Sequence, residues 1–389
     1  MTFEERFDWR LFFIMLALFT ISCVAIYSAI QTNQYSDNFV VRQIMWYTLG
    51  SMIIAGMLMI EPIQYKGLSW YLYGAGTLVL AILVIAPSSI APVINGQKSW
   101  FLLPGIGSIQ PSEFMKIFTI LVLSRVIVNH NKSNQFKTTK TDFYLLLKIM
   151  GVTGLPILLI MQQPDFGTAL VFLGIMSGMI IVAGITWKLI LPIYGVIGAV
   201  GGSVLYLVIQ APEILREYLG IKEYQLGRIY AWLEPYKYQS GDGYHLIKSL
   251  QAIGSGMLTG KGFGDGEVYI PESHTDFIFA VIGEEFGFVG SCLVILVFFL
   301  LIYHLIQLAI RANYSFSAYV CVGVVSMITF HVFQNIGMTV QLLPITGIPL
   351  PFISYGGSSL LANLMAIGLA FAVHFHQREF MFGDNNLQD

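Results

Sequence analysis

The residues best suited to chemistry lie in one short polar run. Residues 271–277 read Pro-Glu-Ser-His-Thr-Asp-Phe, and the apolar run that follows carries two more acids, Glu284 and Glu285. Ionisable side chains at the mouth of a membrane helix are costly to keep there, and they often mark functional sites. Asp276 is therefore a candidate general base or charge stabiliser for a substrate held in lipid. The alternative is structural, because an acid here also complements the positive end of a helix and can cap it.

Glu284 and Glu285 follow on the same expected helix, about 12 Å beyond Asp276 at about 1.5 Å per residue. Two acids at that depth should be neutral or paired. We expect them to form a salt bridge or a hydrogen bond between helices. A proton relay is the alternative.

A second polar group opens an apolar run at residues 110–116, Gln-Pro-Ser-Glu-Phe-Met-Lys. Proline near the first helical position, followed by an acid, is typical of a helix start. Glu113 and Lys116 are three residues apart, so they share one face of that helix. Lys116 lies one turn inside it and needs a partner. Two roles stay open for Lys116: an ion pair with Glu113, or a contact with a phosphate group of a substrate.

Two other loops also carry candidate residues. Trp100, in Lys-Ser-Trp, is typical of an anchor at the membrane–water interface, and the alternative is stacking on a sugar or holding a lipid headgroup. Asp165, in the Pro-Asp-Phe-Gly sequence, fits ordinary turn chemistry. The alternative roles of Asp165 are binding a divalent cation or pairing with Lys116. The sequence contains no known metal-binding motif, Walker motif or nucleophile elbow.

A proline-rich segment, residues 344–359, precedes the last apolar run and includes Ser354. Its three prolines rule out a continuous helix. Non-helical backbone near membrane depth is tolerated where it is buried in protein or lines a wet cavity, so we expect this segment to line a cavity. A rigid connector is the alternative. His331, Gln334 and Asn335, just before it, are expected to form hydrogen bonds between helices rather than to bind metal.

The composition places all these residues in an integral membrane protein. The 389 residues are 56% hydrophobic and only 11% charged, against about 25% charged in soluble domains. The net charge of −2 does not suggest a nucleic-acid partner. The three cysteines lie in apolar runs and form neither a disulfide framework nor a zinc cluster.

A membrane crossing takes about 20 apolar residues, and ten runs of this kind predict an all-α, polytopic protein with about ten transmembrane helices in a single domain spanning residues 1–389. The even number puts both termini on one side. The runs cover approximately residues 11–30, 41–60, 68–87, 112–130, 143–162, 167–185, 188–210, 277–308, 316–340 and 357–376.

Positive charge sets the orientation, because Lys and Arg concentrate in cytoplasmic segments. With cytoplasmic termini, the inner segments hold eleven of the 20 Lys and Arg residues, and the short outer loops hold only Arg42 and Lys98. Six more lie in the long loop, residues 211–274, which this orientation places outside. Residues 245–254 of that loop have helical amphipathic spacing and suit the membrane interface. The candidate residues therefore gather on the outer side.

Read together, these segments resemble the SEDS family of shape, elongation, division and sporulation proteins, which includes RodA and FtsW. The resemblance runs from Trp9 to about residue 378, and residues 89–101 are most similar to RodA. It rests on the order and spacing of residues 98–100, 110–116, 164–169, 243–244, 252–256, 271–277, 284–287 and 349–358.

The resemblance implies an inverting peptidoglycan glycosyltransferase in the bacterial cytoplasmic membrane, which polymerises lipid II at the outer face for cell elongation and shape. A class B penicillin-binding protein is the implied partner. In this reading Asp276 matches the essential acid of the family and is expected to be the base. A lipid II flippase and a non-catalytic scaffold of the cell-wall machinery are the alternatives.

The other site residues follow from the same resemblance. Lys116, steadied by Glu113, is expected to face the pyrophosphate, and Trp100 matches a tryptophan on which the family depends. His274 and Ser354 are also expected to contact substrate. A divalent cation, Mg²⁺ or Mn²⁺, is a possible cofactor, with Asp165 as its candidate ligand.

Overall fold

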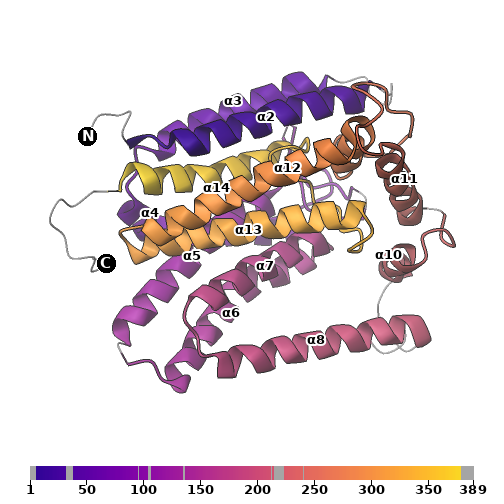
Figure 1. The fold of residues 1–389 in the computed structure, drawn as a ribbon. Helices are drawn as coiled ribbons and strands as arrows, with labels where there is room; N and C mark the ends of the chain where they lie inside the picture. The colour runs from indigo at the N-terminus through magenta and orange to yellow at the C-terminus, as the bar shows by residue number, and fades with distance from the viewer. Residues whose placement is uncertain are drawn as a thin grey trace.

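A computed structural model describes residues 6–31, 38–94, 96–103, 107–134, 136–211, 213, 223–239 and 241–377. Within these residues the protein is a bundle of long helices (Figure 1). The helices are α2 (Trp9–Ile30), α3 (Phe39–Met57), α4 (Pro62–Ile85), α5 (Pro111–Ser133), α6 (Thr139–Met161), α7 (Phe166–Val182), α8 (Trp187–Gln210), α10 (Glu223–Leu233), α11 (Asp242–Ser255), α12 (Ile278–Arg311), α13 (Ser315–Thr339) and α14 (Gly357–Phe375).

Each predicted apolar run corresponds to one of these helices. Among the described residues, eight helices are long and apolar enough to cross a membrane. The other two predicted runs are α7, which is apolar but has only 17 residues, and α5, whose polarity is raised by Glu113, Lys116 and Arg125. The bundle therefore has the all-α, polytopic architecture that the sequence predicts.

Both ends of the described chain lie at the same end of the bundle. His374, near the end of α14, contacts the carbonyl oxygen of Arg6 at 3.0 Å, and the rings of Phe7 and Phe371 stack with centroids 5.5 Å apart. The helices α10 and α11 lie at the opposite end (Figure 1). This arrangement matches the prediction of termini on one side and a long loop on the other.

A short β-hairpin is the one element type that the sequence did not predict. Strands β1 (Phe101–Leu103) and β2 (Gly107–Ile109) pair antiparallel, with Phe101 opposite Ile109. Three residues per strand are too few for an alternating pattern to stand out. The hairpin leads directly into α5.

Most of the long outer loop is folded against the bundle. Residues 212, 214–222 and 240 of the predicted loop lie outside the described part. The expected amphipathic helix is present as α11, and it packs on protein, because Leu246 is buried and Ser249 donates a hydrogen bond to the carbonyl oxygen of Thr339. From α10, Trp232 donates to the carbonyl oxygen of Gln341, whose side chain donates back to that of Trp232.

Helix α12 is too long to be one membrane span, and it is broken. Its 34 residues would extend about 51 Å, against a hydrocarbon core of about 30 Å. Gly287 has non-helical backbone angles, φ 62° and ψ −158°, inside it. Residues 288–311, about 36 Å at 1.5 Å per residue, are long enough to cross the membrane alone. Residues 278–286 form a separate outer segment, so the single span predicted over residues 277–308 is broken at Gly287.

The outer loop supplies the hydrogen bonds that this break removes. A continuous helix would bond the amides of Phe288 and Val289 to the carbonyls four residues earlier, those of Glu284 and Glu285. The two amides instead donate to Met257 and Leu258, at 2.9 and 3.1 Å. The two carbonyls accept from Lys261 and Gly262, each at 3.1 Å. Buried backbone groups need partners, and residues 257–262 supply them on both sides of the break.

A side chain at position 287 should disrupt the hydrogen bonds between residues 257–262 and the two sides of the break. A Cβ atom there would lie 2.3 Å from the backbone nitrogen of Gly260, and the positive φ is strained for other residues. We expect Gly287→Ala to lower the thermal unfolding midpoint and the yield of folded protein sharply. The control is Gly198→Ala in α8, where a Cβ meets open space. Equal unfolding midpoints for the two variants would contradict this role of residues 257–262.

Candidate active site

The loop that carries Asp276 is held by α13 and by the proline-rich segment after it. Asn335 of α13 donates from its side-chain amide to the carbonyl oxygen of Asp276, at 2.8 Å. Ser354 donates to the carbonyl oxygen of Thr275, at 2.6 Å, and the amide of Tyr355 donates to that of His274, at 2.9 Å. Three consecutive carbonyls of the loop are therefore fixed, and the Asp276 side chain starts from a defined backbone position.

The carboxylate of Asp276 is not used for structure. No described residue donates a hydrogen bond to it, and the N-cap of α12 is Phe277 rather than Asp276. The residue is half-buried. Gly347 adjoins it closely, because a Cβ on that glycine would lie 3.4 Å from Oδ2. The capping alternative is therefore not observed, and the carboxylate is available to accept a proton.

The surroundings of Asp276 raise its pKa to about 7. Desolvation by burial is the main cause, because it penalises the charged form. The negative charge of Glu272 raises this pKa further, and the positive charge of Arg228 on α10 opposes the shift. A carboxyl group with a pKa near neutrality suits acid–base catalysis.

His274 lies in an aromatic group beside Asp276. Its ring stacks on Phe39 of α3, with centroids 4.5 Å apart, and lies 5.8 Å from the ring of Tyr355. Burial lowers the pKa of His274, and Glu272 partly opposes this. The residue is 6% exposed, so these contacts favour a role in fixing the loop. A direct contact of His274 with substrate stays a prediction.

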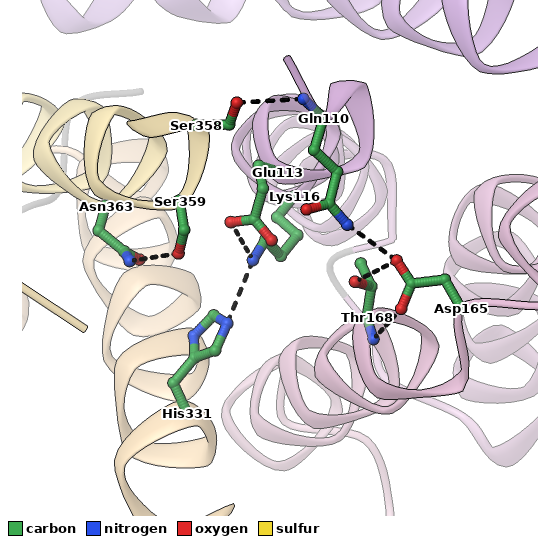
Figure 2. A network of polar contacts seen from close by, with 9 residues as sticks. All are labelled: Gln110, Glu113, Lys116, Asp165, Thr168, His331, Ser358, Ser359 and Asn363. Atoms are coloured by element: carbon green, nitrogen blue, oxygen red, sulfur yellow. Dashed lines mark hydrogen bonds and ion pairs between the residues drawn. The ribbon is translucent and has the colours of Figure 1, made fainter. Parts of the chain in front are cut away.

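Lys116 lies at the centre of a buried polar network (Figure 2). Its ammonium donates to Glu113 Oε2 at 2.8 Å and to His331 Nε2 at 3.1 Å. An ammonium group can only donate, so Nε2 of His331 accepts and the ring proton sits on Nδ1. Lys116 is 1% exposed. The predicted pairing with Glu113 is present, and no sequence pattern indicates His331 as the second partner.

Helix α13 connects this network to the Asp276 loop. His331 and Asn335 are four residues apart, so they lie on one face of the helix with a rise of about 6 Å between them. His331 contacts Lys116, and Asn335 holds the backbone of Asp276. The expected hydrogen bond between helices is confirmed for His331, whereas Asn335 donates to the carbonyl oxygens of two loop residues, Asp276 and Ile348. A single helix face thus positions the candidate base and the buried cation.

Asp165 acts as the N-cap of α7. Its Oδ1 accepts from the amide of Thr168 at 3.0 Å, and its Oδ2 accepts from the Thr168 hydroxyl at 2.8 Å and from Gln110 at 2.9 Å (Figure 2). Three donors fill most of the positions that a carboxylate offers. The described residues contain no group of three or more His, Cys, Asp or Glu side chains suited to a metal. These residues do not fit a cation site at Asp165, whose role as a metal ligand stays a prediction.

Trp100 lies in the outer loop before β1 and is half-buried. The neighbouring Lys98 donates to the carbonyl oxygen of Val84 at 3.0 Å and to that of Ala86, so it caps the end of α4. The amide of Lys98 donates to the carbonyl oxygen of Gln163 at 3.4 Å. The Trp100 loop is thereby tied to the segment that carries Asp165, and substrate contact by Trp100 stays a prediction.

The hydroxyl of Ser354 holds the backbone of the loop. Its hydroxyl donates to the carbonyl oxygen of Thr275 and accepts from the amide of Leu350 at 2.8 Å. Its predicted contact with substrate stays a prediction.

We expect Ser354→Ala to leave two buried backbone groups unsatisfied and to cost about 1–3 kcal/mol each. A lowered thermal unfolding midpoint would show this, with the exposed Ser203→Ala as control. Equal midpoints would contradict this role.

Glu284 and Glu285 have structural partners, as expected. Glu284 forms a salt bridge with Lys261 at 2.7 Å, and Glu285 accepts the hydroxyl hydrogen of Ser28 on α2. The depth differs from the expectation, because the break at Gly287 keeps both acids in the outer segment of α12, beneath the outer loop.

Comparisons with known proteins agree with this architecture. The family model described as "Cell cycle protein", of the FtsW, RodA and SpoVE type, matches residues 8–379. The chain is 36% identical to stage V sporulation protein E of Bacillus subtilis over 387 residues, 95% of this chain and 98% of that protein. It is 34% identical to peptidoglycan glycosyltransferase MrdB of Escherichia coli over 381 residues, 96% of this chain and 95% of that protein.

Solved structures show the same fold. A chain of a peptidoglycan synthase complex matches with a TM-score of 0.73 and 27% identity, covering 96% of this chain and 99% of that chain. The rod shape determining protein RodA of Thermus thermophilus matches with a TM-score of 0.67 and 27% identity, covering 96% of this chain and 98% of that chain. With nearly the whole chain matched in sequence and in fold, this protein belongs to the FtsW/RodA/SpoVE (SEDS) family.

Proposed function

We propose that this protein is a peptidoglycan glycosyltransferase that polymerises lipid II at the outer face of the cytoplasmic membrane. The observation that carries the proposal is the Asp276 carboxylate, held by its backbone in the outer loop, free of hydrogen bonds from described residues and with a pKa of about 7. The name of the Escherichia coli relative, peptidoglycan glycosyltransferase, supports the reaction class. The multi-pass bundle supports a membrane-held substrate.

The proposed reaction is an inverting substitution at a sugar carbon. The 4-hydroxyl of the GlcNAc unit of one lipid II attacks C1 of the MurNAc unit at the end of the growing chain. Asp276 takes the hydroxyl proton as the new C–O bond forms. The C1–oxygen bond to undecaprenyl pyrophosphate breaks, and the pyrophosphate leaves with the bonding electrons.

Lys116 is proposed to offset the charge that develops on the pyrophosphate, with Glu113 and His331 fixing its position. Its burial supports the positioning role, whereas direct contact with phosphate stays a prediction. A divalent cation would supply further charge stabilisation when bound. No step is assigned to it, because Asp165 is occupied by three donors.

We also propose a class B penicillin-binding protein as the partner. One structural neighbour belongs to a peptidoglycan synthase complex in which polymerization and crosslinking are coordinated. The likeness to that chain covers nearly all of this one, which supports a similar assembly here.

Glycan polymer formation by the purified full chain tests the function. Lipid II is supplied with and without a cognate class B penicillin-binding protein, and polymer length is measured on gels. Polymer from the wild type supports the proposal. Lipid II crossing proteoliposome membranes without polymer would instead indicate a flippase, and neither activity with normal complex formation would indicate a scaffold.

The pH dependence of polymerisation should follow the protonation of Asp276. The base form is populated above its pKa of about 7, so we expect activity to rise with pH through this value and to fall below it. Glu272→Gln removes a charge that raises this pKa, and should move the midpoint to lower pH with little change in maximal rate. If Glu272→Gln does not shift the midpoint of the pH–activity profile, that result would contradict the assignment of this midpoint to Asp276.

A further inference from the structure

A small cavity lies beneath the outer loop, between that loop and the first segment of α12. Its volume is about 20 Å³, enough for one water molecule or one ion. The side chains that matter in its wall come from α2, the Asp276 loop and α12: Ser28, Ser273, Glu284 and Glu285. Backbone near Gly266 closes another side. Four separate parts of the chain thus meet at this point.

Two polar atoms of this wall have no partner. Glu285 Oε2 and Ser273 Oγ make no hydrogen bond within the described part of the chain, and each residue is only 3% exposed. Glu285 Oε1 accepts the Ser28 hydroxyl hydrogen. A buried carboxylate oxygen and a buried hydroxyl without partners are each costly. Their presence on the wall of the same cavity indicates a missing ligand with positive charge or donor capacity.

The charge around the cavity is negative. Glu284 and Glu267 share one cation, Lys261, at 2.7 and 3.0 Å. Glu284 Oε1 also accepts the amides of residues 267 and 268. Asp265 lies close enough to Glu285 to interact with its charge. One lysine faces four acids, so Glu285 lacks a compensating cation among the residues named here.

We propose that this cavity is a binding site for a single hard cation, with Glu285 Oε2 and Ser273 Oγ as ligands. Oxygen-only donors favour Mg²⁺, Mn²⁺ or Ca²⁺, and Ser28 and Glu284 add oxygens to the same wall. The cation would join Ser273, three residues before Asp276, to the outer segment of α12. It is a positioning site for the loop, remote from the reacting atoms, and the binding itself does not depend on the proposed function.

Mn²⁺ is the probe, because its unpaired electrons report free and bound ion by electron paramagnetic resonance. The purified full chain, stripped of metal, is titrated with Mn²⁺, and thermal unfolding is followed in parallel. We expect one Mn²⁺ per chain and a raised unfolding midpoint. Glu285→Gln should weaken binding at least tenfold, and Ser273→Ala should weaken it less. Asp165→Asn should bind Mn²⁺ as the wild type does.

Several outcomes overturn the proposal. Absence of Mn²⁺ binding by folded wild type would mean that the cavity holds water beside a protonated Glu285. Binding that is lost in Asp165→Asn but kept in Glu285→Gln would move the ion to α7. If Glu285→Gln does not fold, Ser273→Ala with unchanged Mn²⁺ affinity is sufficient to reject the site. Polymerisation is scored separately, so wild-type protein that polymerises lipid II but binds no Mn²⁺ would reject the cation site while leaving the proposed function intact.

Discussion

Asp276→Asn is expected to reduce glycan polymerisation by about 10²–10⁴-fold, the usual contribution of a general base. The amide keeps the shape of the side chain but cannot take the proton from the attacking hydroxyl. The fold should survive, because no described residue donates to the Asp276 carboxylate, and the loop is held through backbone carbonyls by Asn335 and Ser354. The measurement is polymer formed per minute by the purified variant, beside its thermal unfolding midpoint.

The matched control lies four residues away in the same loop. Glu272 is exposed, and Glu272→Gln should keep the maximal rate at high pH. Asp276→Asn with a rate within a few-fold of the wild type would remove Asp276 from the role of base. A variant of Asp276 that is inactive and also unfolded at the assay temperature would contradict the structural argument instead.

Breaking the buried ion pair on α5 should have the second largest effect. Lys116→Met leaves the carboxylate of Glu113 without its cation, and both residues are at most 5% exposed. Loss of one member of a buried pair costs about 3–5 kcal/mol. Glu113→Gln is expected to destabilise less, because His331 still accepts from Lys116. Thermal unfolding in a fixed detergent measures both.

The double variant Glu113→Gln/Lys116→Met separates stability from catalysis. Removing both charges should recover most of the unfolding midpoint, since no unpaired charge remains. If Lys116 acts on the pyrophosphate, polymerisation stays lost in the stable double variant. Recovered polymerisation would restrict Lys116 to a structural role, and a double variant no more stable than Lys116→Met would contradict the pairing itself.

Local sequence patterns predicted the parts of the fold that depend on local physics. Runs of about 20 apolar residues located the ten long helices. The spacing of Glu113 and Lys116 predicted their shared face, and the structure places the two in contact at 2.8 Å. Pro111 and the acid after it predicted the start of α5, which begins at Pro111. In each case the partners are neighbours along the chain.

Contacts between distant segments were beyond the reach of these patterns. Lys116 and His331 are 215 residues apart, and nothing in either neighbourhood points to the other. The sequence predicts a continuous helix through Gly287, because the neighbours Phe286 and Phe288 are apolar and the loop residues that bond across the break, 257–262, lie about 30 residues earlier. The resemblance predicts a substrate contact for Ser354, and the structure adds hydrogen bonds of its hydroxyl to Thr275 and Leu350, which no local pattern indicates.

The break in α12 has a consequence for how the protein is made. Acidic side chains oppose the partition of a nascent helix from the translocon into lipid. Because residues 288–311 are long enough to cross the bilayer alone, insertion does not require Glu284 and Glu285 to enter it. Residues 278–286 can remain in water on the outer side of the membrane until residues 257–262 fold back and form the backbone hydrogen bonds across the break. Biogenesis is thereby divided into an insertion stage, driven by hydropathy, and a later assembly stage on the outer surface, at which the candidate site is completed.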